Sequence, residues 1–362
     1  MTRVAVFGAT GTVGSSAARR FLADPDYEVV TVSRRPPQLG AVPPYRHVSV
    51  DLRDRDALLA AWVDVGAVDH VVYAALYETP SLVSGWVDPE QIATNRRMFE
   101  NALAAVGSRA EHMTVLQGTK AYGYHLGHIP VPAKESQPRV PHENFYWEQE
   151  DLLTAAATRT GMRYTIFRPQ FIFGDQIGVA MNIVPVIGVY AAITAELGEP
   201  FAFPGGARYV AEAVDSRLLA DAMHWAAHTP AAWNETFNIT NGDVFSWRDM
   251  WPAFARFLGV EPGPDRRRSL AEWLPQQSSV WSRIAERERL RENSLDRLLG
   301  YSHQFADDAF AYTADGSPLA SRAEPVLLST IKLRTAGFTG CIDTEEMFAH
   351  WFGVLRQERY VP

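Results

Sequence analysis

The fold of this chain is decided by residues 4–14, which read Val4-Ala5-Val6-Phe7-Gly8-Ala9-Thr10-Gly11-Thr12-Val13-Gly14. Four apolar residues predict a short strand, and the amphipathic residues 15–22 that follow predict a helix. Glycines at the first, fourth and seventh places of the loop allow a tight turn, a close backbone approach to a pyrophosphate and close packing of the helix. This arrangement predicts a dinucleotide-binding site, with a plain tight turn as the alternative. The predicted cofactor contacts in the loop are Gly8, Thr10, Gly11, Thr12, Val13 and Gly14.

Strands and helices alternate in short units through the first half of the chain. Further strands are predicted at residues 28–32, 71–75, 112–117 and 163–167, and another strand is predicted to end at residue 52. This alternation is typical of an α/β fold of the Rossmann type, a doubly wound parallel sheet with helices on both faces. After residue 174 the alternation fades and tryptophans become frequent. We therefore expect residues 1–174 to form mainly the cofactor-binding domain, and residues 175–362 mainly a smaller C-terminal substrate lobe that returns segments to the sheet.

The end of the second strand indicates which nicotinamide cofactor is used. Ser33, Arg34 and Arg35 stand where an acidic residue would accept a hydrogen bond from the ribose 2′-hydroxyl of NAD. Arginines suit the 2′-phosphate of NADPH instead, although the same side chains would also simply solvate a loop. NADPH is therefore the expected cofactor. The ends of the third and fourth strands supply four further predicted contacts, namely Asp51, Leu52, Ala74 and Ala75.

The composition is that of a soluble enzyme. The 362 residues are 47% hydrophobic and 21% charged, and the single cysteine, Cys341, excludes an internal disulfide framework. A formal net charge of −8 argues against nucleic acid or an anionic membrane surface as a partner. No signal peptide is expected, because the first apolar run is only four residues long, so we predict a cytoplasmic location. A homodimer is compatible with the sequence, but no residue marks an interface.

Three later features favour ordinary structural roles. Residues 179–197 are almost wholly apolar, but an asparagine, a proline and a glutamate interrupt them, which favours a buried helix over a membrane span. The charged residues 283–297 predict an exposed helix. His125 and His128 lack a third ligand, so no metal site is predicted.

Lys120 and Tyr146 are the candidate catalytic residues. Lys120 follows a predicted strand, at the edge where parallel α/β sheets bind their ligands. A tyrosine and a lysine four residues apart on one helix would place an ammonium beside the phenol and lower its pKa. The fourth residue after Tyr146 is instead Glu150, whose charge would oppose that ionisation. The cation must then come from elsewhere, and Lys120 is the best candidate; a surface lysine and a structural tyrosine are the simpler alternatives.

Three segments around these residues carry a resemblance to a known family. They read Gly118-Thr119-Lys120-Ala121-Tyr122, Asn144-Phe145-Tyr146-Trp147-Glu148-Gln149-Glu150-Asp151 and Arg168-Pro169-Gln170-Phe171-Ile172-Phe173-Gly174. The chain resembles the progesterone 5β-reductase and iridoid synthase-like enzymes, which are atypical extended short-chain dehydrogenases/reductases. Further matches at residues 181–182, 189–192, 238–245 and 360–362 extend the resemblance across nearly the whole chain. It departs from the family pattern at Trp147, where a second tyrosine is usual, and just after Lys120.

The resemblance implies NADPH-dependent reduction of the carbon–carbon double bond of an enone or enal. Hydride attack at the β-carbon moves charge onto the carbonyl oxygen, which Tyr146 would stabilise while Lys120 supports the phenol and contacts the ribose. A carbonyl reductase, in which Tyr146 protonates an alkoxide, and a non-catalytic NADPH-binding regulator remain as alternatives. The expected partner is a small apolar α,β-unsaturated carbonyl compound. Further predicted cofactor contacts are Gln117, Gly118, Lys120, Tyr146, Pro169, Phe171 and Ile172, and the predicted substrate contacts are Tyr122, Tyr124, Phe145 and Asn182.

Overall fold

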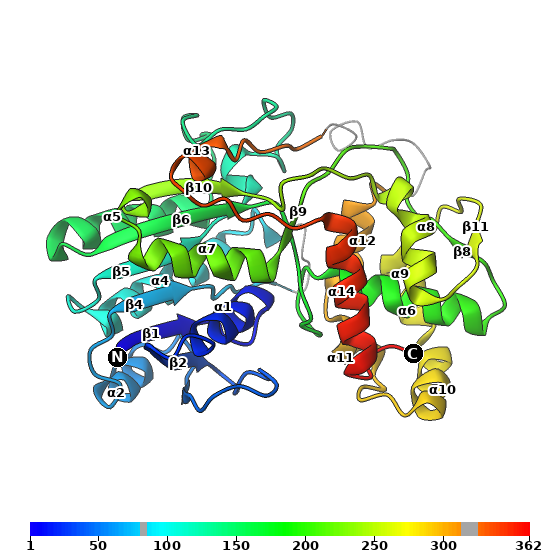
Figure 1. The fold of residues 1–362 in the computed structure, drawn as a ribbon, viewed down its shortest axis with the longest axis horizontal. Helices are drawn as coiled ribbons and strands as arrows, with labels where there is room; N and C mark the ends of the chain where they lie inside the picture. The colour runs from blue at the N-terminus through cyan, green and yellow to red at the C-terminus, as the bar shows by residue number, and fades with distance from the viewer. Residues whose placement is uncertain (80–84, 313–324) are drawn as a thin grey trace.

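The computed structural model of the chain describes residues 1–79, 85–312 and 325–362. An α/β layer that contains the N-terminus lies beside a mostly helical second lobe that contains the C-terminus (Figure 1). The division follows the change in sequence character near residue 174, but the later chain also contributes elements to the α/β layer. The boundary of the two predicted domains therefore stays a prediction.

Seven parallel strands form the central sheet, in the order β10-β6-β5-β4-β1-β2-β3. The first strand pairs with β2 from Thr2 opposite Tyr27, and with β4 from Val4 opposite His70. Winding reverses between β1 and β4, which is the switch point at which such sheets bind dinucleotides. The predicted doubly wound parallel sheet is confirmed. The strand bounds are β1 Thr2–Phe7, β2 Tyr27–Ser33, β3 Arg46–Ser49, β4 His70–Tyr73, β5 His112–Leu116, β6 Arg163–Pro169 and β10 Glu235–Ile239.

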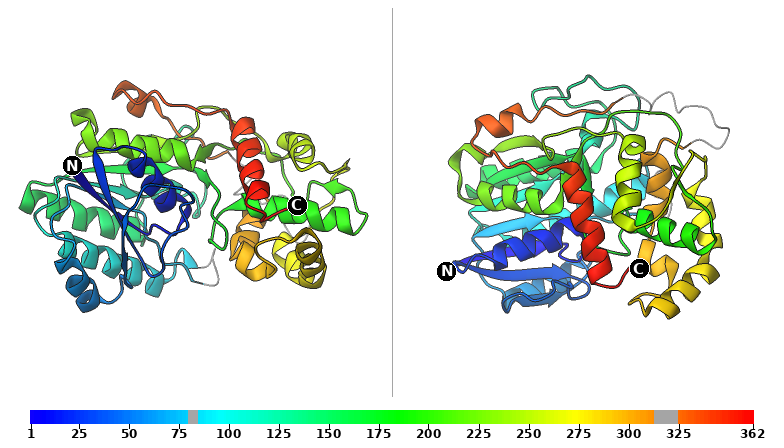
Figure 2. Two further views of the ribbon diagram at one scale, coloured as in Figure 1. Left: turned by 60° about the horizontal axis from the view of Figure 1, so that its bottom comes forward. Right: turned by 45° about the vertical axis from the view of Figure 1, so that its right-hand side comes forward.

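Helices cover both faces of this sheet, because its strands are apolar on both sides. On one face, Phe21 of α1 and Leu219 of α7 belong to one buried core. On the other face, Phe7 of β1 and Phe99 of α4 belong to a second core. The two helical layers are seen from further directions in Figure 2. The first layer contains α1 Thr12–Leu22 and α7 Ser216–His228, and the second contains α2 Arg55–Val63, α4 Pro89–Val106 and α5 Phe145–Thr160.

The second lobe is built around an aromatic core. This core contains Phe348 of the last helix and four further aromatic residues, Trp247, Trp251, Phe254 and Trp281. Two short parallel pairs, β7 with β9 and β8 with β11, complete the fold, and α13 packs against β10. The bounds are β7 Phe171–Phe173, β8 Phe201–Ala202, β9 Ala213–Asp215, β11 Pro262–Gly263, η1 Thr119–Tyr122, η2 Pro230–Ala232, α6 Ile183–Glu196, α8 Trp247–Leu258, α9 Leu270–Gln276, α10 Ser278–Glu288, α11 Leu295–Leu299, α12 Ser302–Ala309, α13 Ile331–Thr335 and α14 Thr344–Gln357.

Two expectations about this lobe meet different outcomes. The apolar stretch forms the buried helix α6, as predicted, and no helix in the described ranges is long and apolar enough to cross a membrane. The single exposed helix predicted for residues 283–297 is wrong. Helix α10 ends at Glu288, Arg289 takes a left-handed backbone conformation (φ 55°), and α11 starts only at Leu295. The buried side chains of Ile284 and Leu298 attach these two short helices to the core.

Candidate active site

The glycine loop has the geometry that a pyrophosphate site requires. Gly8 has φ +80°, and a side-chain Cβ there would lie 2.6 Å from the backbone of Ala75. A Cβ at Gly14 would lie 2.2 Å from the carbonyl oxygen of Gly8, so helix α1 packs too closely on the turn for any other residue. Gly11 is the N-cap of α1 and no side chain caps that helix end. The first backbone N–H groups of α1 are thus left to bind an anion, which fits a dinucleotide.

The arginines that follow β2 are placed to receive a negative charge. Arg34 and Arg35 are exposed, and neither forms an ion pair with another residue of the described chain. The Ser33 hydroxyl donates to the carbonyl of Arg35 (2.8 Å) and shapes the turn. Asp51 is paired with Arg53 (2.6 Å); this hydrogen bond, with a smaller contribution from the charge of Arg34, lowers the pKa of Asp51. The guanidinium groups of Arg34 and Arg35 therefore remain available for a phosphate.

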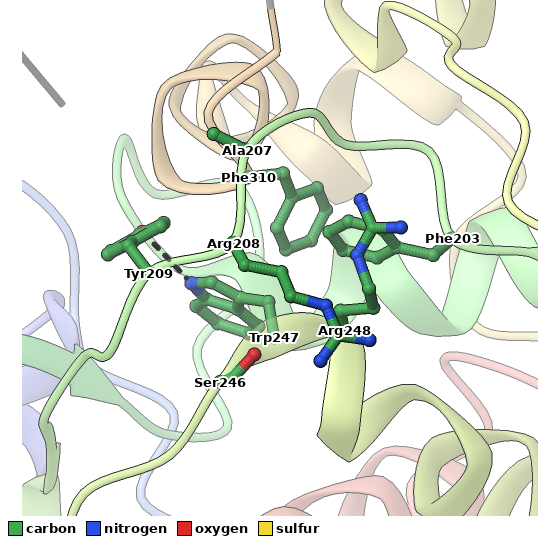
Figure 3. Close-up of a pocket in the computed structure, with 8 residues that line it drawn as sticks. All are labelled: Phe203, Ala207, Arg208, Tyr209, Ser246, Trp247, Arg248 and Phe310. Atoms are coloured by element: carbon green, nitrogen blue, oxygen red, sulfur yellow. Dashed lines mark hydrogen bonds between the residues drawn. The ribbon is translucent and has the colours of Figure 1, made fainter. Parts of the chain in front are cut away.

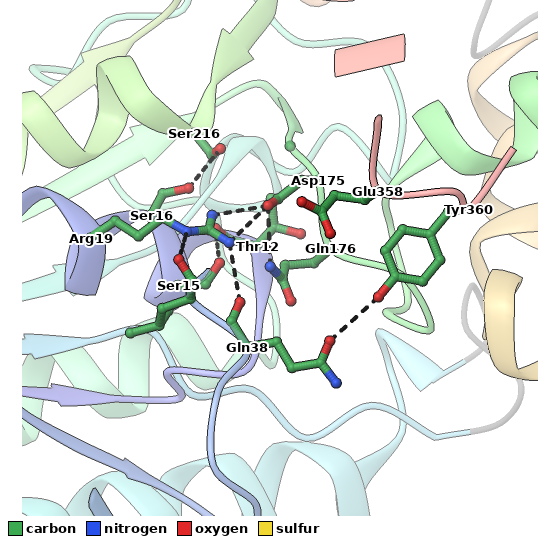
Figure 4. Close-up of polar contacts among 12 residues, drawn as sticks. Thr12, Ser15, Ser16, Arg19, Gln38, Asp175, Gln176, Ser216, Glu358 and Tyr360 are labelled. Atoms are coloured by element: carbon green, nitrogen blue, oxygen red, sulfur yellow. Dashed lines mark hydrogen bonds and ion pairs between the residues drawn. The ribbon is translucent and has the colours of Figure 1, made fainter. Parts of the chain in front are cut away.

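A partly exposed arginine of α1, Arg19, anchors this arginine-bearing segment (Figure 4). Arg19 donates to both carboxylate oxygens of Asp175 (2.8 and 3.1 Å), which lies just after β7. It also donates to the carbonyls of Gln38 and Leu39, each at 3.2 Å. Near the end of the chain, the Tyr360 hydroxyl donates to the side-chain oxygen of Gln38 (3.4 Å). The segment is thereby tied to both lobes.

Tyr146 lies at the carboxyl edge of the sheet, in the first turn of α5. Asn144 caps this helix by accepting from the backbone N–H of Tyr146 (3.0 Å), and it donates to the carbonyl of Lys120 (3.3 Å). A side-chain Cβ at Gly118 would lie 3.2 Å from the Tyr146 hydroxyl and 3.7 Å from the carbonyl of Pro169. The phenol therefore sits against the backbone that follows β5, close to the end of β6. Asn144 thus links the segments that carry Lys120 and Tyr146, and a shared catalytic site for these two residues stays a prediction.

The electrostatics of Tyr146 differ from the expectation. Burial raises the pKa of the Tyr146 hydroxyl, the charge of Glu78 raises it further, and the charge of Arg168 lowers it. The carboxylate that raises the pKa of Tyr146 is thus Glu78 and not Glu150, and the cation that lowers it is Arg168. Such a phenol keeps its proton at neutral pH and acts as a hydrogen-bond donor.

Lys120 has its own buried surroundings. Its ammonium lies 3.7 Å from the centre of the Trp86 ring, in a cation–π contact. Burial lowers the pKa of Lys120, and the charge of Glu78 works in the opposite direction. The site therefore contains a lysine whose charge depends on a neighbouring carboxylate.

Glu150, which occupies the position four residues after Tyr146, is neutralised by a network. Gln117 donates to it (2.8 Å) and accepts from Arg168 (2.7 Å), while Arg139 donates to its other oxygen (2.9 Å). Arg168 is 6% exposed and lies 3.5 Å from Glu150. Sequence reasoning missed Arg168 and Glu78 as site residues. The only signal was that Arg168 lies near the carboxyl end of β6 and that Glu78 follows the carboxyl end of β4.

The predicted substrate residues divide into two pairs. Tyr124, whose ring is 6.1 Å from that of Trp86, and Phe145, whose ring is 4.6 Å from that of Tyr146, lie beside the catalytic candidates. Tyr122 is buried and donates to Asn238 of β10 (2.6 Å). Asn182, 1% exposed, caps α6 and donates to the carbonyls of Gly174 and Gln176 (2.8 and 2.9 Å). The polar atoms of Tyr122 and Asn182 thus serve the fold, so a substrate role for them would require these bonds to break.

Two predicted cofactor contacts beyond β6 point in different directions. The ring of Phe171 lies 5.6 Å from that of Phe305 and 6.2 Å from that of Trp247, so this side chain faces the second lobe. Ile172 packs instead against the core on the α1 and α7 side of the sheet. Both side chains therefore pack within the fold, and a cofactor contact of this segment would have to be made by its backbone.

A shallow hollow in the second lobe is lined by neither Lys120 nor Tyr146 (Figure 3). Its two arginines are already engaged, Arg208 with Asp249 (3.1 Å) and Arg248 with Asp265. This neutralisation leaves no free charge to bind a ligand. In the part of the chain that the structure describes, no three histidine, cysteine, aspartate or glutamate side chains gather as a metal site would require. The hollow is lined by Phe203, Ala207, Arg208, Tyr209, Ser246, Trp247, Arg248 and Phe310.

The segment that contains the glycine loop matches a known protein family. The sequence model of the NAD dependent epimerase/dehydratase family matches residues 4–240. This chain belongs to that family. It is an oxidoreductase of the extended short-chain dehydrogenase/reductase type.

Relatives within this family confirm the resemblance noted in the sequence. The chain is 30% identical over 379 residues to (S)-8-oxocitronellyl enol synthase of Antirrhinum majus and 29% identical over 380 residues to that of Catharanthus roseus. It is 29% identical over 381 residues to 3-oxo-Delta(4,5)-steroid 5-beta-reductase of Arabidopsis thaliana. Each comparison covers 99% of this chain and 92% of the relative. The chain is therefore a member of the progesterone 5β-reductase and iridoid synthase-like group.

Solved structures of this dehydrogenase family share the fold. UDP-glucose 4-epimerase of Thermus thermophilus, in a complex with NAD, superposes with a TM-score of 0.66 at 19% identity. The superposition covers 97% of this chain and 99% of that one. The likeness confirms the Rossmann-type architecture of the family member described here.

Proposed function

We propose that this protein uses NADPH to reduce the carbon–carbon double bond of an activated enone or enal. The observation that carries the proposal is the half-buried Tyr146, whose hydroxyl keeps its proton and lies at the carboxyl edge of β5 and β6, next to the segment that carries Lys120. The Arabidopsis thaliana relative is a 3-oxo-Delta(4,5)-steroid 5-beta-reductase, a name that describes reduction of a double bond conjugated to a ketone. A small apolar α,β-unsaturated carbonyl compound is the substrate class that suits both.

NADPH, when bound, supplies the hydride. Tyr146 then donates a hydrogen bond to the carbonyl oxygen as negative charge moves onto it from the β-carbon. A phenol whose pKa is raised by burial keeps its proton, so it stabilises the enolate without first being ionised. The α-carbon is protonated from solvent. One such buried donor contributes on the order of 3 kcal/mol to transition-state stabilisation.

Lys120 supplies the positive charge of this site. Its ammonium is buried against Trp86 and is suited to bind the ribose hydroxyls of the cofactor. The aromatic rings of Trp86 and Tyr124 stand beside it and provide an apolar surface for the substrate. The exposed Arg34 and Arg35 support a preference for NADPH over NADH. The nearby carboxylate of Asp51 pairs with Arg53 instead of with either of them.

The test is consumption of NADPH with a panel of conjugated enals and enones, followed by identification of the product by mass and NMR. Ene-reduction predicts a saturated carbonyl compound. An allylic alcohol would instead identify a carbonyl reductase. Tight NADPH binding with no turnover across the panel would favour the non-catalytic regulator.

A further inference from the structure

The segment that follows β4 is held rigidly by buried amides of α4. Asn95 accepts from the N–H of Tyr77 and donates to its carbonyl, each at 2.9 Å. Gln91 accepts from the N–H of Thr79 and donates to the Glu78 carboxylate, again each at 2.9 Å. Both amide side chains are 0% exposed. The Glu78 carboxylate is therefore fixed in place by a dedicated set of bonds and is not a mobile loop residue.

One oxygen of this carboxylate is left open. Oε2 of Glu78 accepts from Gln91, whereas Oε1 is buried and has no hydrogen-bond partner within the described chain. A buried carboxylate oxygen without a partner is costly, so a residue arranged in this way usually has a role beyond the fold. Its charge acts on two groups of the candidate site, Lys120 and Tyr146.

Among the described residues, Glu78 is the carboxylate whose charge acts on Lys120. The other ionisable groups near the lysine–tyrosine pair include Tyr122 of η1, Tyr124 beside Trp86, and Arg168 of β6, which is shared with Glu150. Glu150 is already paired with Arg139 as well. Burial raises the pKa of Glu78 and the charge of Lys120 lowers it, while the charge of Glu78 raises the pKa of Lys120, so each group favours the charged form of the other.

We propose that Glu78 is a positioning residue for Lys120, the buried counter-charge that keeps the ammonium protonated and directed toward the cofactor ribose. This inference rests on the proposed function, because it is the charge of Lys120 that the reaction uses. Trp86 covers the ammonium by a cation–π contact, which excludes water and makes the counter-charge more effective.

The consequence is a defined dependence on pH. Burial alone disfavours the charged form of Lys120, and Glu78 offsets that effect. Removing the negative charge should therefore lower the pKa of Lys120 further. Since a lysine loses its charge as pH rises through its pKa, the basic limb of the rate profile should move to lower pH.

The test compares Glu78→Gln with wild-type protein over pH 6 to 10. The amide keeps an oxygen that accepts from Gln91, so the scaffold bond is preserved while the charge is removed. Two readouts are taken: turnover, and acetylation of Lys120 by acetic anhydride, measured by peptide mass spectrometry. We expect the midpoint of the basic limb of turnover and the midpoint of the acetylation profile both to fall by about one pH unit or more. Turnover should then fall roughly tenfold above pH 8 and much less at pH 6.5.

Two further variants control this experiment. Glu148→Gln removes an exposed carboxylate of α5 that pairs with Arg96, and it should shift neither midpoint. In a Lys120→Arg background, Glu78→Gln should no longer shift the rate profile, because a guanidinium stays charged throughout this range.

The outcomes separate the inference from the proposed function. An equal loss of turnover at every pH, with an unshifted acetylation midpoint, would make Glu78 a purely structural residue and overturn the inference. A shifted acetylation midpoint in a protein that turns over no enal or enone would support the inference about Lys120 and contradict the proposed reaction.

Discussion

The two edges of the central sheet bury ionisable side chains in contrasting ways. At the carboxyl edge, Lys120, Glu78 and Arg168 bring opposite charges into one site. At the amino edge, the imidazole rings of His70 and His112, which begin β4 and β5, lie 6.0 Å apart. Two histidines of α7 join them, since the rings of His70 and His228 are 5.5 Å apart and those of His224 and His228 are 5.4 Å apart.

The amino edge keeps its two strand histidines neutral. Burial lowers the pKa of His70 to about 4 and that of His112 to about 3. The ring of His112 is satisfied by the neutral hydroxyl of Thr165 (2.9 Å), and the Tyr27 hydroxyl pairs with His228. Buried histidines that carry no charge are typical of a structural cluster.

The comparison shows which buried polar groups indicate function. Each edge leaves a buried polar atom without a hydrogen-bond partner in the described chain, His70 Nδ1 at the amino edge and Glu78 Oε1 at the carboxyl edge, but the carboxyl edge also brings opposite charges together. Perturbed titration alone therefore does not identify an active site, because the strongest shifts among histidines lie at the structural edge. Opposite charges at the topological switch point are the better indicator.

The largest expected effect is that of removing the phenol hydroxyl at the carboxyl edge. Tyr146→Phe should lower turnover by a few hundredfold, because one buried donor to the developing enolate is lost. Steady-state NADPH oxidation measures the effect. The matched control is Tyr27→Phe at the amino edge, where burial also raises a tyrosine pKa, to about 12. Equal effects of the two variants would remove the distinction between the edges.

Removing the ammonium should have the next largest effect. Lys120→Ala should lower turnover by roughly a hundredfold, and NADPH binding measured by calorimetry should weaken by a smaller factor through loss of the ribose contact. Lys332→Ala, which removes an exposed lysine paired with Glu235, is the control. A wild-type rate in Lys120→Ala would show that the carboxyl-edge charges are not catalytic.

The arginines after β2 should set cofactor preference. Replacing Arg34 and Arg35 together by alanine removes charge-assisted hydrogen bonds worth about 1.5–3 kcal/mol each to a phosphate. NADPH affinity should fall by at least tenfold, while NADH affinity changes little. Arg46→Ala, at the nearby start of β3, should leave both affinities unchanged. Parallel loss of both cofactors would contradict a 2′-phosphate site.

The smallest expected effect concerns the histidines of the amino edge. Because the folded-state pKa of His70 lies below its ordinary value of 6.5, the unfolded chain binds more protons, and stability falls as pH drops from 6.5 toward 4. Between pH 7 and 5.5 this histidine should account for a loss of about 1 kcal/mol. Urea unfolding of wild type and His70→Leu at the two pH values measures it. An identical loss in the variant would show that His70 is not the titrating group.

Sequence reasoning reached the sheet because local patterns determine it. The loop at residues 4–14 requires glycine at Gly8 and Gly14 for steric reasons that the structure confirms. The same locality explains why α6 was found. Sequence reasoning failed at residues 283–297, where Arg289 breaks the helix. A charged sequence does not reveal which of its leucines a distant core will bury.

The site was less accessible to such reasoning. The role proposed for Glu78 depends on its hydrogen bond to Gln91, thirteen residues further on in a helix, and on Lys120, which follows another strand. Asn182 was expected to contact substrate, but both of its amide hydrogens are used on Gly174 and Gln176. Pairings between separate elements are set by tertiary packing, which no single segment encodes.

The most direct test of the proposed reaction is the position of the transferred hydride. The protein is supplied with NADPH that carries deuterium at the transferable C4 position and with a conjugated enal, and the product is analysed by ²H NMR. We predict a saturated aldehyde with deuterium on the β-carbon. Deuterium on the carbinol carbon of an allylic alcohol would contradict ene-reduction at the site of Tyr146 and Lys120.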